Sequence, residues 1–370
     1  MRIALLTSSL GAGGAERVAT TLCNAWDKRG DSVKLISTYS GGGKPFYDIE
    51  AGVDLEFLSD IVGDNSKSFM NYIRRYFALR RTLLKTKPDV VVSFLPNVNV
   101  VSILALAFTG IPVVVCERRD PSSQPTNKFW EYGCSVLYRF ADAVVVQTQN
   151  VRNTIGEIYP NLKKVVTIAN PLSLELIQRQ PERVDCAVRK SLLSLGRLAP
   201  EKQVEHTILT FSRIASAFSD WDLHIYGDGP MREELEVLTR ELKLSSRIFF
   251  GGRTINPWQI MESSDLFVMT SRFEGFPNAL LEAMCMGLPC VAYDCPSGPQ
   301  DISLGGKVAL LANLNNQDQL STHLSSLMGN QELRNNLGKL ARESVIERFH
   351  LNKVLNDWDN LFKGLGVKGE

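Results

Sequence analysis

The sequence predicts an α/β fold of two doubly wound domains, each with a mostly parallel sheet covered by helices on both faces. Three observations support this prediction. The chain has 370 residues, which exceeds the roughly 250–300 residues at which single hydrophobic cores stop growing. Short β-branched runs alternate with helical patterns along most of the chain. The alternation fades in a charged stretch from about Pro171 to Arg189 and then restarts.

Ten apolar runs are expected as strands, because strands buried on both faces of a parallel sheet are apolar almost throughout. In the first domain they are Ile3–Ser8, Val33–Thr38, Val90–Leu95, Val113–Cys116 and Ala143–Gln147, and in the second they are Leu192–Leu195, Leu223–Tyr226, Ile248–Phe250, Leu266–Met269 and Cys290–Tyr293. We expect domains at residues 1–172 and 173–349. We also expect a terminal helix within residues 350–370. The sequence leaves open which domain it belongs to, and one of the two alternatives is that it packs back on the first domain.

Residues 90–116 contain no charged side chain and are long enough for a membrane span. Pro96 and two asparagines interrupt the first third of this segment, and Gly110 and Pro112 interrupt the last third. Strand, turn, helix, turn and strand is therefore the favoured interpretation.

A basic amphipathic helix is predicted between Lys67 and Lys87, because this stretch carries Lys and Arg side chains, no acidic residue and several large apolar ones. Such a helix indicates either contact with an anionic membrane or acceptor, or an ordinary helix with a solvated basic face. The arginines concerned are Arg74, Arg75, Arg80 and Arg81. A net charge of +1 and the lack of a nucleic-acid-binding motif argue against nucleic acid as the partner.

Seven scattered cysteines in mostly apolar surroundings indicate reduced thiols in a cytosolic protein. Cys285, Cys290 and Cys295 are regularly spaced, but no histidine lies near them and their spacing matches no zinc pattern. We therefore expect no metal site.

The stretch 272–289, "RFEGFPNALLEAMCMGLP", follows an apolar strand and opens a helix. Pro277 fits the first helical turn, where its missing N–H costs nothing. Glu274 then lies in the preceding loop and Glu282 inside the helix, while backbone N–H groups around Phe276 and Asn278 face an anion. Two carboxylates thus flank a predicted phosphate site.

A second signal is "LGRLAPEKQ", residues 195–203, after the first strand of the second domain. Arg197 and Lys202 lie five residues apart across a strand-to-helix turn, which lets both cations converge on one diphosphate. The turns "YGDGP" and "FFGGR" end the next two strands, and their glycines allow backbone to approach a base or ribose.

The first strand runs into "GAGGAER", which places Gly11 and Gly13 as in a dinucleotide-binding G-x-G-x-x-G turn. The third position is Glu16, whose bulk and charge prevent close packing beside a pyrophosphate. We interpret this stretch as a loop from which Gly13 and Gly14 reach a nucleotide held mainly by the other domain.

Together, Gly14, the Arg197 and Lys202 pair and the E-x7-E motif of Glu274 and Glu282 resemble glycosyltransferase family 4, over nearly the whole chain. The resemblance implies the GT-B fold, with two Rossmann-like domains facing across a cleft, and retaining transfer from a nucleotide sugar. The stretches "GGAER" and "DCPSGPQDI" resemble bacterial enzymes that build surface polysaccharides or lipid-linked oligosaccharides, of the amylovoran and N-acetylgalactosamine-transferring type.

The resemblance also implies roles for single residues. Arg197 and Lys202 neutralise the diphosphate leaving group, Glu282 binds ribose hydroxyls and Glu274 contacts the donor sugar. The backbone contacts to the nucleotide sugar are expected at Gly13, Gly14, Gly229, Arg253, Gly275, Phe276, Pro277 and Asn278. The donor is expected to be UDP-linked, and no cofactor beyond it is required.

This sequence departs from the family pattern after the strand "VVVC". Several members carry a histidine after a glutamate there, whereas Arg118 follows Glu117 here. Both are expected on the acceptor side. Since no partner for a double-displacement nucleophile is evident, we expect front-face retention, in which the departing phosphate accepts the proton of the acceptor.

The expected function is transfer of a hexose or N-acetylhexosamine to a saccharide acceptor, lipid-linked, at the cytoplasmic face of the inner membrane. Three alternatives remain open at this point: a nicotinamide-dependent oxidoreductase, a nucleotide-sugar epimerase of the same architecture, and a non-catalytic polysaccharide-assembly subunit. The oxidoreductase leaves the E-x7-E and R-x4-K residues without a role.

Overall fold

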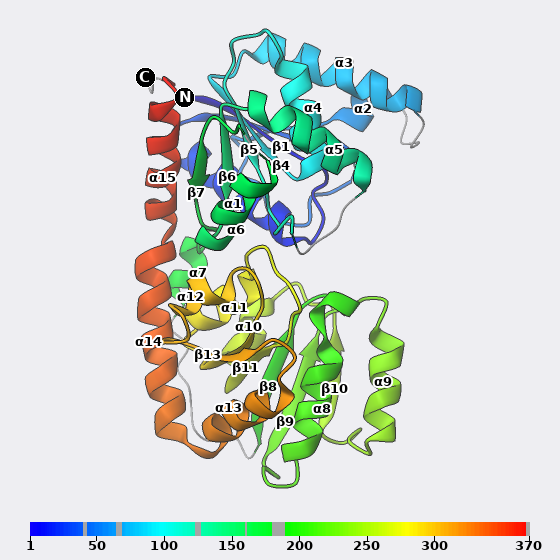
Figure 1. The fold of residues 1–370 in the computed structure, drawn as a ribbon, viewed down its shortest axis with the longest axis vertical. Coiled ribbons are helices and arrows are strands. Elements are labelled where there is room, and N and C mark those ends of the chain that lie inside the picture. Colours follow the sequence, from blue (N-terminus) through cyan, green and yellow to red (C-terminus); the bar gives the residue numbers. More distant parts are fainter. Residues whose placement is uncertain (40–42, 64–68, 123–126, 160, 180–188, 368–370) are drawn as a thin grey trace. The chain divides into compact units, whose positions relative to one another are not determined.

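The computed structural model describes residues 1–39, 43–63, 69–122, 127–159, 161–179 and 189–367. The chain divides into two compact units, one formed by Met1–Pro171 with Asn352–Glu370 and the other by Leu172–Leu351 (Figure 1). Both are α/β units with a parallel sheet, as the alternation of apolar runs and helical patterns predicts.

The first unit has a seven-stranded sheet in the order β3-β2-β1-β4-β5-β6-β7. All its strand pairs are parallel. The strands are β1 (Arg2–Thr7), β2 (Ser32–Ser37), β3 (Asp54–Phe57), β4 (Val90–Phe94), β5 (Val113–Cys116), β6 (Ala143–Val146) and β7 (Val165–Thr167). The helices are α1 (Gly14–Lys28), α2 (Leu58–Val62), α3 (Phe69–Thr86), α4 (Pro96–Leu106), α5 (Lys128–Leu137) and α6 (Gln149–Ile158).

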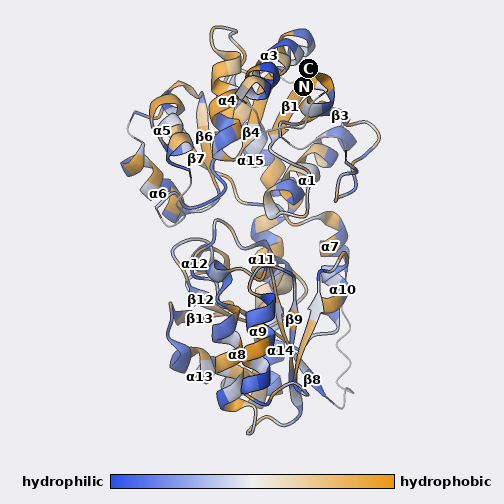
Figure 2. Ribbon diagram, turned by 90° about the vertical axis from the view of Figure 1, so that its right-hand side faces the viewer, coloured by the Kyte–Doolittle hydropathy of each residue, from blue (hydrophilic) through white to orange (hydrophobic). Residues whose placement is uncertain are grey.

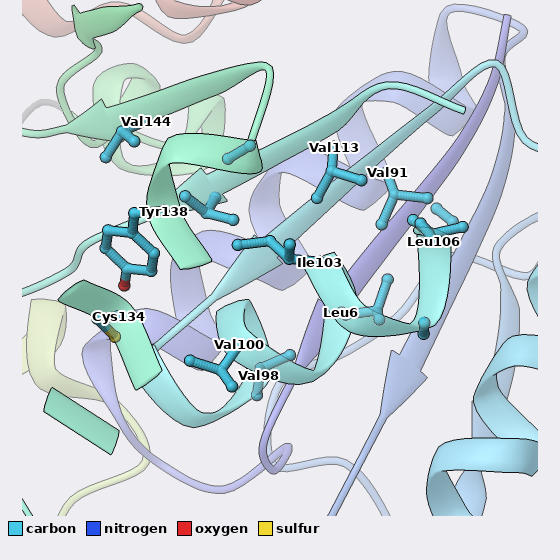
Figure 3. Packing of buried hydrophobic residues seen from close by; sticks show 14 of the residues in the cluster. Leu6, Val91, Val98, Val100, Ile103, Leu106, Val113, Cys134, Tyr138 and Val144 are labelled. Carbon is cyan, nitrogen blue, oxygen red and sulfur yellow. The ribbon is translucent and has the colours of Figure 1, made fainter. Parts of the chain in front are cut away.

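One hydrophobic cluster of this unit lies between the sheet and helices α3 to α6. Figure 3 shows Val98 and Ile103 of α4, with Tyr138, facing strand residues such as Val91 and Val144. These side chains are at most 6% exposed. The strands β4, β5 and β6 are buried at every position, which accounts for their continuous apolar sequence.

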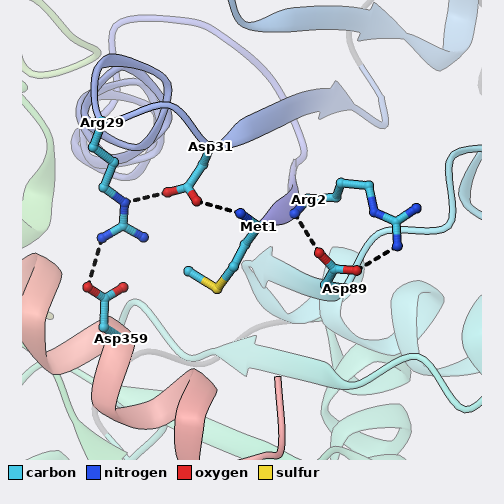
Figure 4. Close-up of polar contacts among 6 residues, drawn as sticks. All are labelled: Met1, Arg2, Arg29, Asp31, Asp89 and Asp359. Atoms are coloured by element: carbon cyan, nitrogen blue, oxygen red, sulfur yellow. Dashed lines mark hydrogen bonds and ion pairs between the residues drawn. The ribbon is translucent and has the colours of Figure 1, made fainter. Parts of the chain in front are cut away.

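The terminal helix α15 (Leu351–Gly364) belongs to the first unit from Asn352 onward. Its Trp358 and Phe362 pack on Trp26 of α1, with ring centroids 5.9 and 6.0 Å apart. Asp359 accepts a hydrogen bond of 2.8 Å from Arg29, which also pairs with Asp31 (Figure 4). The helix is therefore an integral part of this unit's core.

The second unit has a six-stranded parallel sheet in the order β10-β9-β8-β11-β12-β13. The strands are β8 (Lys190–Leu195), β9 (Trp221–Tyr226), β10 (Ile248–Gly252), β11 (Leu266–Met269), β12 (Cys290–Asp294) and β13 (Leu310–Asn313). The helices are α7 (Leu174–Gln178), α8 (Val204–Ile214), α9 (Arg232–Glu241), α10 (Pro257–Glu262), α11 (Asn278–Cys285), α12 (Pro299–Ser303), α13 (Gln317–Gly329) and α14 (Gln331–Phe349).

Both sheets reverse their strand order next to the first strand, between β1 and β4 in one unit and between β8 and β11 in the other. In doubly wound sheets, ligands bind outside the carboxyl ends of the strands at such a reversal. The fold therefore directs attention to the loops that follow β8 and β11.

All ten predicted runs are strands. The segment 90–116 folds as predicted, into β4, α4 and β5, and no helix in the described part of the chain is long and apolar enough to cross a membrane. Three edge strands, β3, β7 and β13, escaped prediction because they have only three or four residues and are largely exposed or half-buried. Helix α11 begins at Asn278, one residue later than expected, with Pro277 as its N-cap.

Six cysteines are buried with free thiols, and Cys186 lies outside the described residues. Burial raises the pKa of Cys285 and of Cys295 to about 12. These thiols are therefore protonated at neutral pH and serve as core side chains.

Helices α11 and α14 approach each other closely at Gly338. A Cβ atom on Gly338 would lie 2.1 Å from the carbonyl oxygen of Gly287, just after α11. Gly156 in α6 differs, because a Cβ atom there meets nothing within 4 Å. Both glycines lie inside helices. Comparing their alanine variants therefore separates the effect of packing on stability from the effect of helix propensity.

We predict that Gly338→Ala destabilises the second unit by about 1–3 kcal/mol, because backbone must move to admit the methyl group. Gly156→Ala stabilises the first unit by about 0.5–1 kcal/mol, because alanine is the better helix former and meets open space. Urea unfolding of both variants measures these changes. A Gly338→Ala variant as stable as the wild type would contradict the close approach.

Candidate functional site

The loops after β8 and β11 are joined by an ion pair. The ammonium Nζ of Lys202 lies 2.6 Å from Oε1 of Glu274. The side chains are 25% and 13% exposed, so the pair is largely shielded and still accessible from one side. The hydroxyl of Ser271 donates to the same Oε1 at 2.7 Å. Oε2 of Glu274 has no partner among the described residues, which leaves it available to a ligand hydroxyl.

The backbone of the two loops is joined as well. The 3-10 turn Pro200–Lys202 follows β8, and its Glu201 carbonyl accepts from the N–H of Arg272 at 2.8 Å. The hydroxyl of Thr270 donates to the carbonyls of Lys202 and Gln203. These bonds fix the position of Lys202 relative to the start of the E-x7-E motif.

The charge state of Lys202 follows from this arrangement. Burial lowers the pKa of the Lys202 ammonium, but the carboxylate of Glu274 more than offsets that effect, so the pKa lies above its ordinary value. Lys202 is therefore a fixed cation at neutral pH.

Arg197 stands beside this pair in sequence, directly after β8. Its side chain is exposed, and within the described part of the chain no hydrogen bond or ion pair holds its guanidinium. Arg197 and Lys202 thus provide one uncommitted and one paired cation at the reversal of the strand order. The sequence predicts that Arg197 and Lys202 bind one diphosphate together, and this prediction requires two cations at this edge of the sheet.

The glycine turns after β9 support the Arg197 turn. A Cβ atom on Gly229 would lie 2.2 Å from the carbonyl oxygen of Leu198, and one on Gly227 would lie 1.7 Å from that of Gly196. The N–H of Leu198 donates to Asp228 at 3.0 Å. The structure therefore gives Gly229, predicted as a nucleotide contact, a packing role against the turn that carries Arg197.

Glu282 lies on α11 and is 7% exposed. Its Oε2 accepts a hydrogen bond of 3.2 Å from the indole N–H of Trp258 on α10. Sequence reasoning missed Trp258, because the residues around it form no recognisable motif. The indole orients a carboxylate that was predicted to bind ribose.

The residues between the two glutamates line the start of α11. Gly275 is held by the hydroxyl of Ser297, which donates to its carbonyl at 2.9 Å. Phe276 and Pro277 are buried, and α11 has neither a side-chain cap nor an acidic residue in its first turn. Asn278 is its first residue. An uncapped helix start is suited to an anion.

Arg253 is exposed immediately after β10, whose Gly252 has a φ of +70°. It therefore belongs to the same carboxyl edge of the second sheet.

Gly13 and Gly14, by contrast, lie in the first unit, at the N-cap and first residue of α1. Gly13 is in an extended conformation, and the Glu16 side chain folds back beside it to accept from Ser9 at 2.7 Å.

Glu117 and Arg118 of the first unit lie in different surroundings. Glu117 is fully buried, accepting from Tyr138 at 2.9 Å and from Arg119 at 3.1 Å. Burial raises the pKa of its carboxyl group. Arg118 instead lies with its guanidinium carbon 3.6 Å from the ring centroid of Phe94. Glu117 thus belongs to an internal polar network, and Arg118 lies outside that network.

The four arginines of α3 also divide into two groups. Arg75 donates to the carbonyl of Tyr39 at 3.3 Å and Arg80 donates to that of Ala105 at 2.6 Å, whereas Arg74 and Arg81 are exposed. Arg75 and Arg80 therefore bind neighbouring backbone, which their sequence spacing did not reveal.

No group of three or more His, Cys, Asp or Glu side chains within the described ranges is placed to hold a metal ion.

Two doubly wound units with parallel sheets of seven and six strands are the architecture of a glycosyltransferase of the GT-B fold. Residues 12–176 match the family model described as Glycosyltransferase Family 4 and residues 187–344 match Glycosyl transferases group 1. The chain belongs to glycosyltransferase family 4. This membership favours transfer over the oxidoreductase, epimerase and non-catalytic alternatives.

Two curated relatives and one solved structure illustrate the similarity. An α-1,4-N-acetyl-D-galactosaminyltransferase of Campylobacter jejuni, named for a diphospho-undecaprenol-linked substrate, is 24% identical, with 97% of each chain covered. The amylovoran biosynthesis glycosyltransferase AmsD of Erwinia amylovora is 25% identical, covering 95% of this chain and 96% of the relative. The Anabaena protein HepE, solved with UDP and glucose, has a TM-score of 0.81 at 18% identity, with 100% of each chain covered.

We predict that Glu274→Gln lowers the free energy of unfolding of the second unit by about 1–3 kcal/mol at pH 7, because it leaves the Lys202 charge without its carboxylate. The ion pair stabilises fully below the ordinary lysine pKa of 10.5. Its contribution disappears as the pH rises through the raised value in the folded protein. The difference between variant and wild type should therefore shrink at strongly alkaline pH.

Urea titrations at pH 7 and at about pH 11 measure this difference. Glu234→Gln, an exposed carboxylate on α9, is the matched control and should change stability little at either pH. A loss for Glu274→Gln that stays constant or grows toward alkaline pH would show that the ion pair is not its cause.

Proposed function

We propose that this glycosyltransferase transfers a hexose or N-acetylhexosamine from a UDP-sugar, with retention, to a lipid-linked saccharide acceptor in bacterial surface glycan assembly. The observation that carries the proposal is the 2.6 Å contact between Lys202 and Glu274 at the strand reversal, with exposed Arg197 on the same turn. The relatives' names support the acceptor class, and the UDP in the HepE structure supports the donor.

In this proposal, Arg197 and Lys202 bind the diphosphate, and Glu274 accepts from donor-sugar hydroxyls through Oε2. Glu282, oriented by Trp258, accepts from the ribose. Backbone at Gly275 to Asn278 binds the sugar and phosphates, and Arg253 lies beside the base.

The proposed reaction proceeds at one face of the sugar. The bond from the anomeric carbon to the diphosphate breaks, an oxocarbenium-like carbon develops, and the acceptor oxygen bonds to that carbon. A leaving phosphate oxygen takes the acceptor proton. Lys202 and Arg197 stabilise the charge that develops on the diphosphate, which is the largest contribution expected from this site. No step requires a metal ion.

We predict that Arg197→Ala and Lys202→Ala each reduce kcat by about 10²–10³, the usual effect of removing one preorganised group that stabilises developing charge. UDP release from saturating UDP-sugar measures turnover, with Arg240→Ala on the exposed face of α9 as the control. Turnover close to wild type in both variants would rule out the assignment.

The membrane part of the proposal rests on one face of α3. Met70, Phe77 and Leu84 recur every seven residues along the helix and are 57%, 62% and 43% exposed. Arg74 and Arg81 are exposed at alternate positions between them. Apolar and hydrophilic residues accordingly alternate along α3 (Figure 2). Such a face fits an anionic membrane surface and supports the proposed position at the cytoplasmic face of the inner membrane.

We predict that Arg74→Glu combined with Arg81→Glu weakens binding to phosphatidylglycerol vesicles more than tenfold at low salt, since each basic side chain near such a surface contributes about 1 kcal/mol. Co-sedimentation measures the change. The control replaces exposed Arg139 and Arg152 of the same unit by Glu. Equal losses in both double variants would indicate an effect of net charge and would exclude α3 as the membrane-binding face.

A further inference from the structure

The carboxyl edge of the first sheet carries a half-buried arginine with no acidic partner in the described part of the chain. Arg118 follows β5, packs its guanidinium on Phe94 and donates from Nη1 to Oδ1 of Asn170 at 2.5 Å. Its Nε is buried and has no hydrogen-bond partner among the described residues. Burial without a neighbouring carboxylate lowers the pKa of Arg118 to about 10.

The neighbouring Arg119 shows how this protein compensates the charge of a buried arginine with its own residues. Arg119 is buried and pairs with Glu117 at 3.1 Å, so its charge is compensated inside the protein. Buried charges that lack a counterion are costly, and proteins keep them where a ligand supplies the opposite charge. Arg118 is only partly buried as a whole, so solvent and ligands reach its outer atoms.

A second buried donor without a partner in the described residues directly follows the neighbouring strand β6. The register pairs Val115 with Val144 and Cys116 with Val145, and the N–H of Glu117 donates to the carbonyl of Val145. Arg118 and Gln147 therefore both follow the carboxyl ends of paired neighbouring strands. Gln147 is 4% exposed, and its Nε2 has no partner among the described residues.

We propose that Arg118 and Gln147 form an anion-binding subsite in the first unit, and that it takes a phosphate group of the acceptor. Guanidinium and amide N–H groups are donors, and no carboxylate of the described chain competes for them. Phosphate oxygens accept hydrogen bonds from guanidinium and amide groups, and the outer guanidinium atoms of Arg118 offer a planar fork that binds them. The acceptor assignment rests on the proposed function; the anion subsite itself rests on the contacts above.

The test measures pyrophosphate binding to the full chain by calorimetry, in an Arg197→Ala and Lys202→Ala background that removes the two cations proposed to bind the donor diphosphate. Arg118→Met should weaken binding at least tenfold, and Arg118→Lys should weaken it less, because it keeps the charge without the fork. Arg139→Met, which removes an exposed arginine of the same unit, should leave the affinity unchanged.

Gln147→Glu separates ligand binding from folding. The new carboxylate should pair with Arg118, raise the Tm and abolish pyrophosphate binding. Unchanged affinity in Arg118→Met or in Gln147→Glu would overturn the subsite, as would equal losses in Arg118→Met and Arg139→Met. If Arg118→Met lost binding to phosphatidylglycerol vesicles but kept its affinity for pyrophosphate, Arg118 would belong to a lipid-binding surface. That result would overturn the acceptor assignment.

Activity distinguishes failure of this inference from failure of the proposed function. Arg139→Met in the otherwise wild-type enzyme should release UDP from UDP-sugar at the wild-type rate without acceptor. Arg118→Met should raise the KM for a diphosphate-linked acceptor at least tenfold. Lack of UDP release by the wild type would contradict the proposed function, while pyrophosphate binding would still decide the subsite.

Discussion

Parallel strand order is the constraint on which both units depend. Because all strands of a unit run in one direction, their carboxyl ends lie along one edge, and the loops that leave this edge separate where the strand order reverses. In the second unit that point lies between β8 and β11, and the residues suited to phosphate and sugar chemistry follow these two strands. The first unit places Arg118 and Gln147 along the equivalent edge of its own sheet.

The second unit holds Lys202 and Glu274 in position by contacts within the protein. Lys202 is bonded to Glu274 and its turn is joined by backbone hydrogen bonds to the loop after β11. Glycines at 227 and 229 let the adjacent turn pack against it. In the proposed reaction, Lys202 then needs little reorganisation when charge develops on the leaving group, which is the condition under which fixed cations accelerate a reaction most.

The sequence predicted the parts of the fold that depend on local patterns. Central strands are continuous apolar runs because helices cover both faces, so all ten were recognised. The edge strands β3, β7 and β13 are short and partly exposed, and they carry little of that signal. For the site, the spacing of Glu274 and Glu282 and the strand-to-turn position of Lys202 were visible. The contacts of Trp258 with Glu282 and of Asn170 with Arg118 were not, because they join residues 24 and 52 positions apart.

The first unit is built from two separate stretches of chain. Trp358 and Phe362 on α15 complete the packing around Trp26, so this unit lacks part of its core until the last helix exists. Residues 172–351 form a continuous unit that has all its strands earlier during synthesis. Domains usually fold in the order in which they leave the ribosome. In this protein, all residues of the second unit therefore leave the ribosome before the residues of α15 that complete the core of the first unit.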